Sequence, residues 1–364
     1  MKSCSEKKRR REVDRFSSLP DEIICHILSF LLTKEVVGTN ILSKRWYPLW
    51  RSVPVIDFTN KYQLSTINGT VYLRFIYILS KVLLFRDNIE RFSLTLDKCP
   101  HHQNINQIYN LIDFVLGRGV QQLELDFDFP KSFPMGVFRC NTLVYLKLDG
   151  FDKINVISYV ELPSLKILHL GYIQFAQDSC LLQLLSGCPN LEDFEALTVF
   201  IDHHSCQEFK TLTNLIRAYV VFCETEFVLD VLNNVEFLRM HISLEIFSKY
   251  RWQWFVQMLK HCPKLRNLRI TENCMSGIDN ENWVCPTFVP ECVSLCVREC
   301  TILEYKGDKD EVLFARYIME NARVLQTLRI HFDLELGSNT KLKAKKKLLL
   351  CKKKHLATCN LSFN

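Results

Sequence analysis

The first fifty residues have their apolar positions at helical spacing. Within segment 16–52 these positions recur at steps of three and four, at Ile23, Ile24, Ile27, Leu28 and Leu31. This spacing predicts a helix with one continuous apolar face. Pro20 with two acids directly after it predicts a helix start at about residue 21. Two further short helices are expected before residue 52, so the segment is a small three-helix unit.

This unit carries more large apolar side chains than three short helices can bury among themselves. Val36, Val37, Leu42, Trp46 and Trp50 follow the first helix within twenty residues. The surplus must pack against another surface. That surface is either the first layer of the larger domain in this chain or a partner protein.

Beyond residue 53 the spacing changes to a recurring triplet of the form L-x-x-L-x-L. Nine copies start at Ile89, Val120, Leu143, Leu165, Leu191, Leu215, Val235, Leu265 and Leu325. From residue 120 to residue 265 the starts lie 20 to 30 residues apart, close to the period of about 20 to 29 of leucine-rich repeats. Each triplet predicts a strand with its apolar residues in the core.

Helical patterns fall between several triplets, at 105–116, 179–185, 244–260 and 312–321. A strand followed by a helix in every unit predicts an α/β solenoid of parallel strands, in which each repeat buries its neighbour. We place the solenoid at 53–280. Residues 281–364 close it, and Cys359, Leu361 and Phe363 alternate as a last strand does.

Composition excludes several classes of protein. No apolar stretch approaches the ~20 residues of a membrane span, and the charged start of the chain has no secretory apolar region. We therefore expect a protein of the cytoplasm, the nucleus or both, without a membrane partner. The 16 cysteines are then expected as reduced core residues.

Metal ligands and cofactor motifs are not expected. Two groups contain candidate ligands, but neither has the paired C-x-x-C spacing of structural zinc sites: Cys292, Cys296 and Cys300, and His203, His204 and Cys206. The sequence has no Walker loop, G-x-S-x-G elbow or H-E-x-x-H motif. Asp126 and Asp128 flank a strand end, where acids are routine. We expect no catalytic residue, no metal and no cofactor.

The net charge of +6 is concentrated at the two ends of the chain. Residues 1–12 carry +4 and residues 341–355 carry +8, which leaves −6 for the body. An acidic body argues against wrapping of nucleic acid. Residues 1–15 are expected to form a disordered basic arm, whose run at 7–11 is either an import signal or simply solvated. Segment 342–355 is either a surface helix with packed leucines or an anion-binding helix.

The N-terminal unit resembles the F-box in its plant form. The resemblance rests on three runs in order: Leu19-Pro20-Asp21-Glu22-Ile23-Ile24, Ile27-Leu28-Ser29-Phe30-Leu31, and Leu42-Ser43-Lys44-Arg45-Trp46 with Leu49-Trp50. It implies binding to a Skp-type adaptor and, through the adaptor, to a cullin ubiquitin ligase. The adaptor-binding residues are then Leu19, Pro20, Ile23, Ile24, Ile27, Leu28, Leu31, Val36, Val37, Leu42, Ser43, Trp46 and Trp50.

The last eighty residues resemble the FBD domain that closes many plant F-box proteins. The similar segments are Trp283–Pro286, Val289–Cys292, Tyr305–Gly307 and Glu311–Ala322. With the F-box, this resemblance spans nearly the whole chain and implies a non-catalytic subunit that recruits a target to a ubiquitin ligase. Two alternatives remain: a nucleic-acid or chromatin protein that uses the basic ends, or an F-box protein without a ligase role.

The outward positions of the strands are where a target is expected to bind. Residues that alternate with the triplet leucines line the concave sheet. They are mainly acidic in the early repeats and mainly basic in the later ones. We expect an acidic target segment to bind the later repeats through Arg217, Tyr219, Arg239, His241 and Arg269.

Overall fold

The structure is a computed structural model of the whole chain. It describes residues 18–59, 69–86, 88–96, 105–128, 133–152, 154–155, 159–201, 212–221, 231–243, 251–273, 286–355 and 359–364. The basic arm expected at 1–15, the candidate ligands His203, His204 and Cys206, and Trp283 lie outside these residues. No helix in the described ranges has both the length and the apolarity that a membrane crossing needs.

The N-terminal unit consists of short helices, as its spacing predicts. They are α1 (Asp21–Leu28), α2 (Thr33–Gly38), the 3-10 turn η1 (Thr39–Ile41) and α3 (Trp46–Ser52). Their core is separate from that of the repeats and consists of Ile24, Leu28, Val36, Trp46, Leu49, Trp50 and Val53. The first helix is a turn shorter than its apolar spacing suggests, because α1 ends at Leu28.

The rest of the described chain is one parallel sheet whose twelve strands follow each other in sequence order. The strands are β1 (Val55–Phe58), β2 (Arg91–Leu96), β3 (Gln122–Phe127), β4 (Tyr145–Asp149), β5 (Ile167–Phe175), β6 (Asp193–Ile201), β7 (Arg217–Val221), β8 (Phe237–Ser243), β9 (Asn267–Asn273), β10 (Glu299–Tyr305), β11 (Thr327–Phe332) and β12 (Asn360–Phe363). Consecutive parallel strands without reversal are the topology of a solenoid, so the predicted α/β fold is confirmed.

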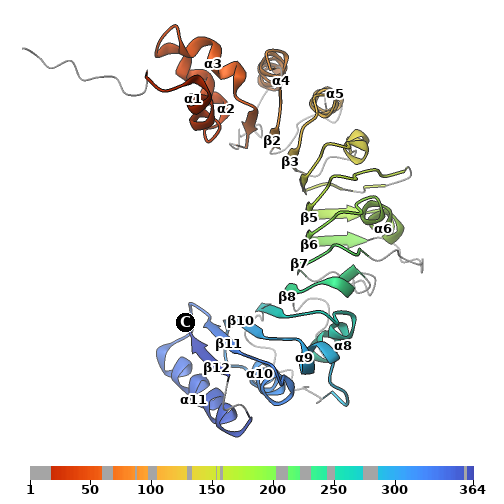
Figure 1. Cartoon of the computed structure of the whole chain (residues 1–364), viewed down its shortest axis with the longest axis vertical. Coiled ribbons are helices and arrows are strands. Elements are labelled where there is room, and N and C mark those ends of the chain that lie inside the picture. Colours follow the sequence, from red (N-terminus) through yellow and green to blue (C-terminus); the bar gives the residue numbers. More distant parts are fainter. Residues whose placement is uncertain are drawn as a thin grey trace, which may run out of the picture.

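The strands line the inside of an arc and the helices cover its outside (Figure 1). The connecting elements are α4 (Gly69–Leu84), α5 (Ile105–Leu116), η3 (Met135–Arg139), α6 (Asp178–Ser186), η4 (Leu232–Asn234), α8 (Arg251–Met258), η5 (Leu259–His261), α9 (Glu291–Leu295), α10 (Lys309–Asn321) and α11 (Ser338–His355). Every apolar residue of the nine triplets is at most 3% exposed. The triplets therefore form the core between the sheet and the helices.

The F-box-like unit joins the solenoid directly, because β1 follows α3 after two residues. The backbone N–H of Asp57 on β1 donates to the buried hydroxyl of Thr33 on α2, at 2.7 Å. Arg86, fully buried after α4, donates to the Val53 carbonyl and lies 5.4 Å from the Trp50 ring centre. Burial lowers the pKa of Arg86 to about 10. These contacts hold the helical unit against the first repeat.

The region that resembles FBD closes the C-terminal end of the sheet. After β10 the chain turns at Gly307, where φ is +83°, and an added Cβ would lie 2.8 Å from the Cβ of Ala344 on α11. The buried Glu311 carboxylate accepts the backbone N–H groups of Lys306, Gly307 and Asp308 at 3.0, 2.6 and 3.1 Å. One carboxylate thus fixes the turn and begins α10.

The basic segment at the C-terminus forms α11, which packs on α10. Ala344 and Leu348 are buried, whereas Leu342, Leu349 and Leu350 are 53%, 39% and 66% exposed. The expected surface helix is present, but the expectation that its leucines pack is wrong for these three. Ala344 and Leu348 lie one turn apart on the same side of α11, so the packed face is narrow and these three leucines face outward.

The described cysteines are free thiols, and most are buried, including Cys292 and Cys300. Burial raises the pKa of both thiols to about 12, which disfavours the thiolate that binds metals. Within the described ranges, no group of three or more His, Cys, Asp or Glu residues is arranged to hold a metal ion. Cysteine serves here as a small apolar core residue.

Candidate functional site

The thirteen predicted adaptor-binding residues divide into two groups by their exposure. Ile24, Leu28, Val36, Trp46 and Trp50 are at most 9% exposed and form the small N-terminal core. Leu19 and Val37 are half-buried against that core. These side chains hold the helices together and present little surface to a partner. The exposed members are Pro20, Ile23, Ile27, Leu31, Leu42 and Ser43.

Apolar side chains remain exposed on the N-terminal unit. Ile23 and Ile27 lie one turn apart on α1 and are 46% and 40% exposed. Phe30 and Leu31 continue the same side into the turn after α1, at 78% and 37%. A large apolar surface that the chain itself leaves uncovered marks an interaction site.

Sequence reasoning missed three members of this exposed set. Phe30, Ile41 and Tyr47 are 78%, 90% and 56% exposed, yet they were not predicted as adaptor contacts. Ile41 lies in η1, which interrupts the expected second helix and turns the residue outward. Phe30 follows Ile27 by three residues, so helical spacing could have placed Phe30 on the same face as Ile27.

The uncovered apolar surface continues onto the first solenoid helix. Arg51 on α3 lies 5.4 Å from the Tyr47 ring centre and 4.7 Å from that of Phe85, just after α4. On α4, Leu73, Tyr77 and Ile78 are 53%, 62% and 53% exposed. The helical unit and α4 therefore present neighbouring apolar surfaces.

The concave face of the sheet is the second candidate surface. Strand register places one outward residue of each strand in a row: Asp57, Ser93, Glu124, Lys147, His169, Glu195, Tyr219, Arg239, Arg269, Thr301, Arg329 and Ser362. Acidic side chains predominate up to β6 and arginines from β8 onward. The change of charge along the face follows the sequence expectation.

The predicted target-binding arginines differ in their partners. Arg217 donates to Asp193 at 2.8 Å, so its charge is largely compensated. Arg239 and Arg269 are register partners on neighbouring strands, both are exposed, and the described residues give neither an ion pair. Arg239 lies 4.3 Å from the Tyr219 ring centre. Two adjacent uncompensated guanidinium groups are suited to bind carboxylates.

His241 lies two residues after Arg239 on β8 and therefore on the same face of the sheet. Burial, with the nearby Arg239 charge, lowers the pKa of His241, while Glu304 opposes the shift. Its buried Nε2 atom has no hydrogen-bond partner in the described part of the chain. The lowered pKa favours the neutral form of the imidazole.

Comparison with known proteins matches three segments of the chain to three families. The F-box domain matches residues 16–58, a leucine-rich repeat matches 164–189, and FBD matches 286–330. An Arabidopsis thaliana F-box/FBD/LRR-repeat protein is 27% identical over 87% of this chain and 92% of its own length. An FBD-associated F-box protein of the same plant is 28% identical over 97% and 100%.

The chain is thus similar over most of its length to Arabidopsis F-box/FBD/LRR-repeat proteins, and it contains F-box, leucine-rich-repeat and FBD matches in that order. Its helices α1 to α3 lie in the F-box match, and Gly307 and Glu311 lie in the FBD match. A further F-box/LRR-repeat relative is 39% identical over 50% of this chain and 48% of its own length. Among solved structures, a Listeria monocytogenes internalin covers 79% of the chain at 11% identity, with a TM-score of 0.33 too low to support an argument.

Proposed function

We propose that this protein is the substrate-recognition subunit of a Skp-cullin-F-box ubiquitin ligase. In this role α1 to α3 bind the Skp-type adaptor, the concave sheet binds a target, and the chemistry belongs to the partners. The observation that carries the proposal is the exposed apolar surface of a matched F-box, with Ile41 90% exposed and Phe30 78% exposed beside a complete core. A partner must cover such a surface to make it stable in water.

Direct contact with the adaptor is proposed for the exposed residues Ile23, Ile27, Phe30, Leu31, Ile41, Leu42 and Tyr47, with Pro20 and Ser43 at the edge. The buried residues act through the helices that they hold in place. Binding then removes apolar area from water without unfolding the unit. Tethering a target beside the ligase raises its effective concentration there.

Replacement of Ile27 and Leu42 by glutamate is expected to abolish adaptor capture. Each is at least 40% exposed, so the fold tolerates the charge, whereas an apolar interface does not. A central anchor contributes about 2 kcal/mol or more, which is about 30-fold in affinity. The measurement is a quantitative pull-down of a Skp-type adaptor by the full chain.

Leu334→Glu with Leu350→Glu is the matched control, since these two leucines are 96% and 66% exposed in the C-terminal part of the chain. It makes the same change in charge and is expected to leave capture at the parent level. Equal capture by the Ile27→Glu, Leu42→Glu variant and the parent, with unchanged circular dichroism, would contradict the proposal.

On the concave face, we propose that an acidic target segment binds Arg239 and Arg269, flanked by Tyr219 and His241. Arg217 contributes less, because Asp193 already binds it. Arg239→Glu with Arg269→Glu is expected to remove proteins that proximity labelling with the parent enriches, while adaptor capture persists. Arg298→Glu with Arg323→Glu, two exposed arginines outside the row, should keep the parent's labelling. Undiminished labelling by the first variant would place the target elsewhere.

A further inference from the structure

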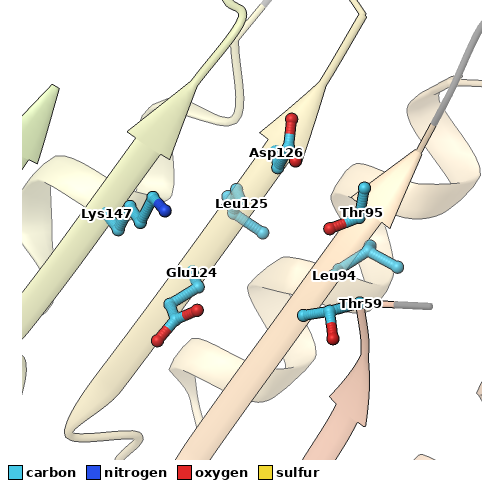
Figure 2. Close-up of a pocket in the computed structure, with 7 residues that line it drawn as sticks. All are labelled: Thr59, Leu94, Thr95, Glu124, Leu125, Asp126 and Lys147. Atoms are coloured by element: carbon cyan, nitrogen blue, oxygen red, sulfur yellow. The ribbon is translucent and has the colours of Figure 1, made fainter. Parts of the chain in front are cut away.

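A polar cavity opens on the concave face at the F-box end of the sheet (Figure 2). Its volume is about 230 Å³, and Thr59, Leu94, Thr95, Glu124, Leu125, Asp126 and Lys147 line it. Leu94 and Leu125 are at most 1% exposed, so their side chains belong to the core and the strands form the cavity floor. Polar side chains from β2, β3 and β4 and from the end of β1 form its walls.

Carboxylates outnumber cations around this cavity. Glu124 and Asp126 project outward from β3, and Lys147 is the register partner of Glu124 on β4. None of these three has an ion pair or hydrogen bond within the described ranges. Asp149 is the register partner of Asp126; burial, and then the Asp126 charge, raises its pKa. The Lys147 charge opposes this shift, so one cation faces three carboxylates and relieves their mutual repulsion only in part.

A buried hydroxyl gives a second and independent indication of a ligand. Thr95 is 7% exposed, and its side chain projects from β2 into the cavity toward β3 (Figure 2). No residue of the described chain forms a hydrogen bond with that hydroxyl. A bound group that displaces water from the cavity can form a hydrogen bond with this hydroxyl.

We propose that this cavity binds an arginine side chain of the target, and this inference rests on the proposed role of the concave face in target recognition. A guanidinium has five donors in a planar fork. It can bridge two carboxylates on one side of a strand and also donate to a threonine hydroxyl. Lys147 is placed to bind a backbone carbonyl of the same target segment.

The two charged sites then select a target with opposite charges at its two ends. The cavity lies on β2 to β4, and Arg239 and Arg269 lie on β8 and β9. At about 4.8 Å per strand, about five strand spacings, or roughly 24 Å, separate them along the sheet. A basic residue and an acidic segment that far apart would bind together, in one orientation only.

The test compares two small probes that differ in charge. N-acetyl-arginine methylamide and N-acetyl-citrulline methylamide have nearly the same shape, but only the first is a cation. Each is titrated into the full chain and followed by saturation-transfer NMR. The arginine probe is expected to bind at least fivefold more tightly than the citrulline probe.

Cavity variants locate the binding. Glu124→Gln with Asp126→Asn is expected to weaken the arginine probe at least fivefold, and Thr95→Val at least twofold. Glu195→Gln removes one carboxylate from the same row outside the cavity, and it should leave the affinity unchanged. If the double variant melts below the parent, the single variants Glu124→Gln and Asp126→Asn replace it.

Equal binding of the two probes, or unchanged binding of arginine by the cavity variants, overturns the inference. Adaptor capture by the same variants is measured in parallel and is expected to equal that of the parent. If the parent chain does not distinguish the two probes but still captures the adaptor, the inference that the cavity binds arginine is rejected and the proposed ligase role is unaffected. If the parent chain prefers the arginine probe but does not capture the adaptor, the cavity inference stands and the proposed ligase role fails.

Discussion

Glu311→Ala is expected to destabilise the C-terminal end of the solenoid by about 3 kcal/mol, because it removes one buried, charged acceptor that three backbone N–H groups share. The carboxylate is 2% exposed and accepts three consecutive backbone N–H groups at the turn before α10. Without it, the turn at Gly307 loses its partner and α10 loses its capping box. Hydrogen exchange should accelerate first in α10 and α11, since repeats unfold locally.

Glu320→Ala on the same helix is the control. Glu320 pairs with Arg316 at the surface, at 2.5 Å, and such exposed pairs contribute about 0.5 kcal/mol or less. Adaptor capture by Glu311→Ala should persist, because the F-box core is separate. Equal protection of α10 amides in the Glu311→Ala variant and the parent would refute the structural role of this carboxylate.

Gly150→Ala is expected to destabilise the middle of the solenoid by about 3 kcal/mol, from a strained backbone and a steric clash. Gly150 directly follows β4 and has φ at +76°, and an added Cβ would lie 1.8 Å from the Phe127 carbonyl oxygen on the neighbouring strand. Backbone cannot move aside as a flexible side chain does. A urea melt followed by circular dichroism measures the loss.

Gly38→Ala is the control, because the same substitution is expected to preserve or raise stability at this position. Gly38 has helical φ and ψ at the end of α2, and an added Cβ there meets no atom within 4 Å. Alanine is favoured over glycine in a helix by up to about 1 kcal/mol, so this variant should melt at or above the parent. A Gly150→Ala melt equal to that of Gly38→Ala would show that the β4 turn relaxes freely.

The apolar spacing predicted most of the solenoid because its core consists of one repeated environment. All nine triplets lie in strands or directly before them, and the helix expected at 105–116 has the bounds Ile105–Leu116. Two strands escaped prediction. Around β1 the buried residues are Val53, Ile56 and Phe58, and around β10 they are Val297, Cys300 and Ile302. Neither set contains a leucine, and cysteine in the second is easily considered a ligand.

The functional surfaces were less predictable, since they depend on neighbours distant in sequence. Alternation along one strand indicates that Arg217 faces outward, but only the register shows that Asp193 lies beside it and that Arg239 lies beside Arg269. The cavity combines residues from β2, β3 and β4 with Thr59 directly after β1, and Thr59 and Lys147 are far apart in the chain. In the F-box, spacing identified the apolar residues without separating the core from the exposed set.

Because the F-box joins β1 directly, the number of strands fixes the distance from the F-box to any point along the sheet. Thr33, Arg86 and Trp50 leave no flexible linker between the helices and the first strand. The proposed target site on β8 and β9 lies seven to eight strands from β1, or about 34–38 Å along the sheet at about 4.8 Å per strand. Removing one whole repeat would shorten that reach by about 5 Å and rotate the target by one strand twist of about 20–25°. In the proposed ligase, the count of repeats, and not only the side chains on them, would set which lysines of a bound target reach an attached enzyme.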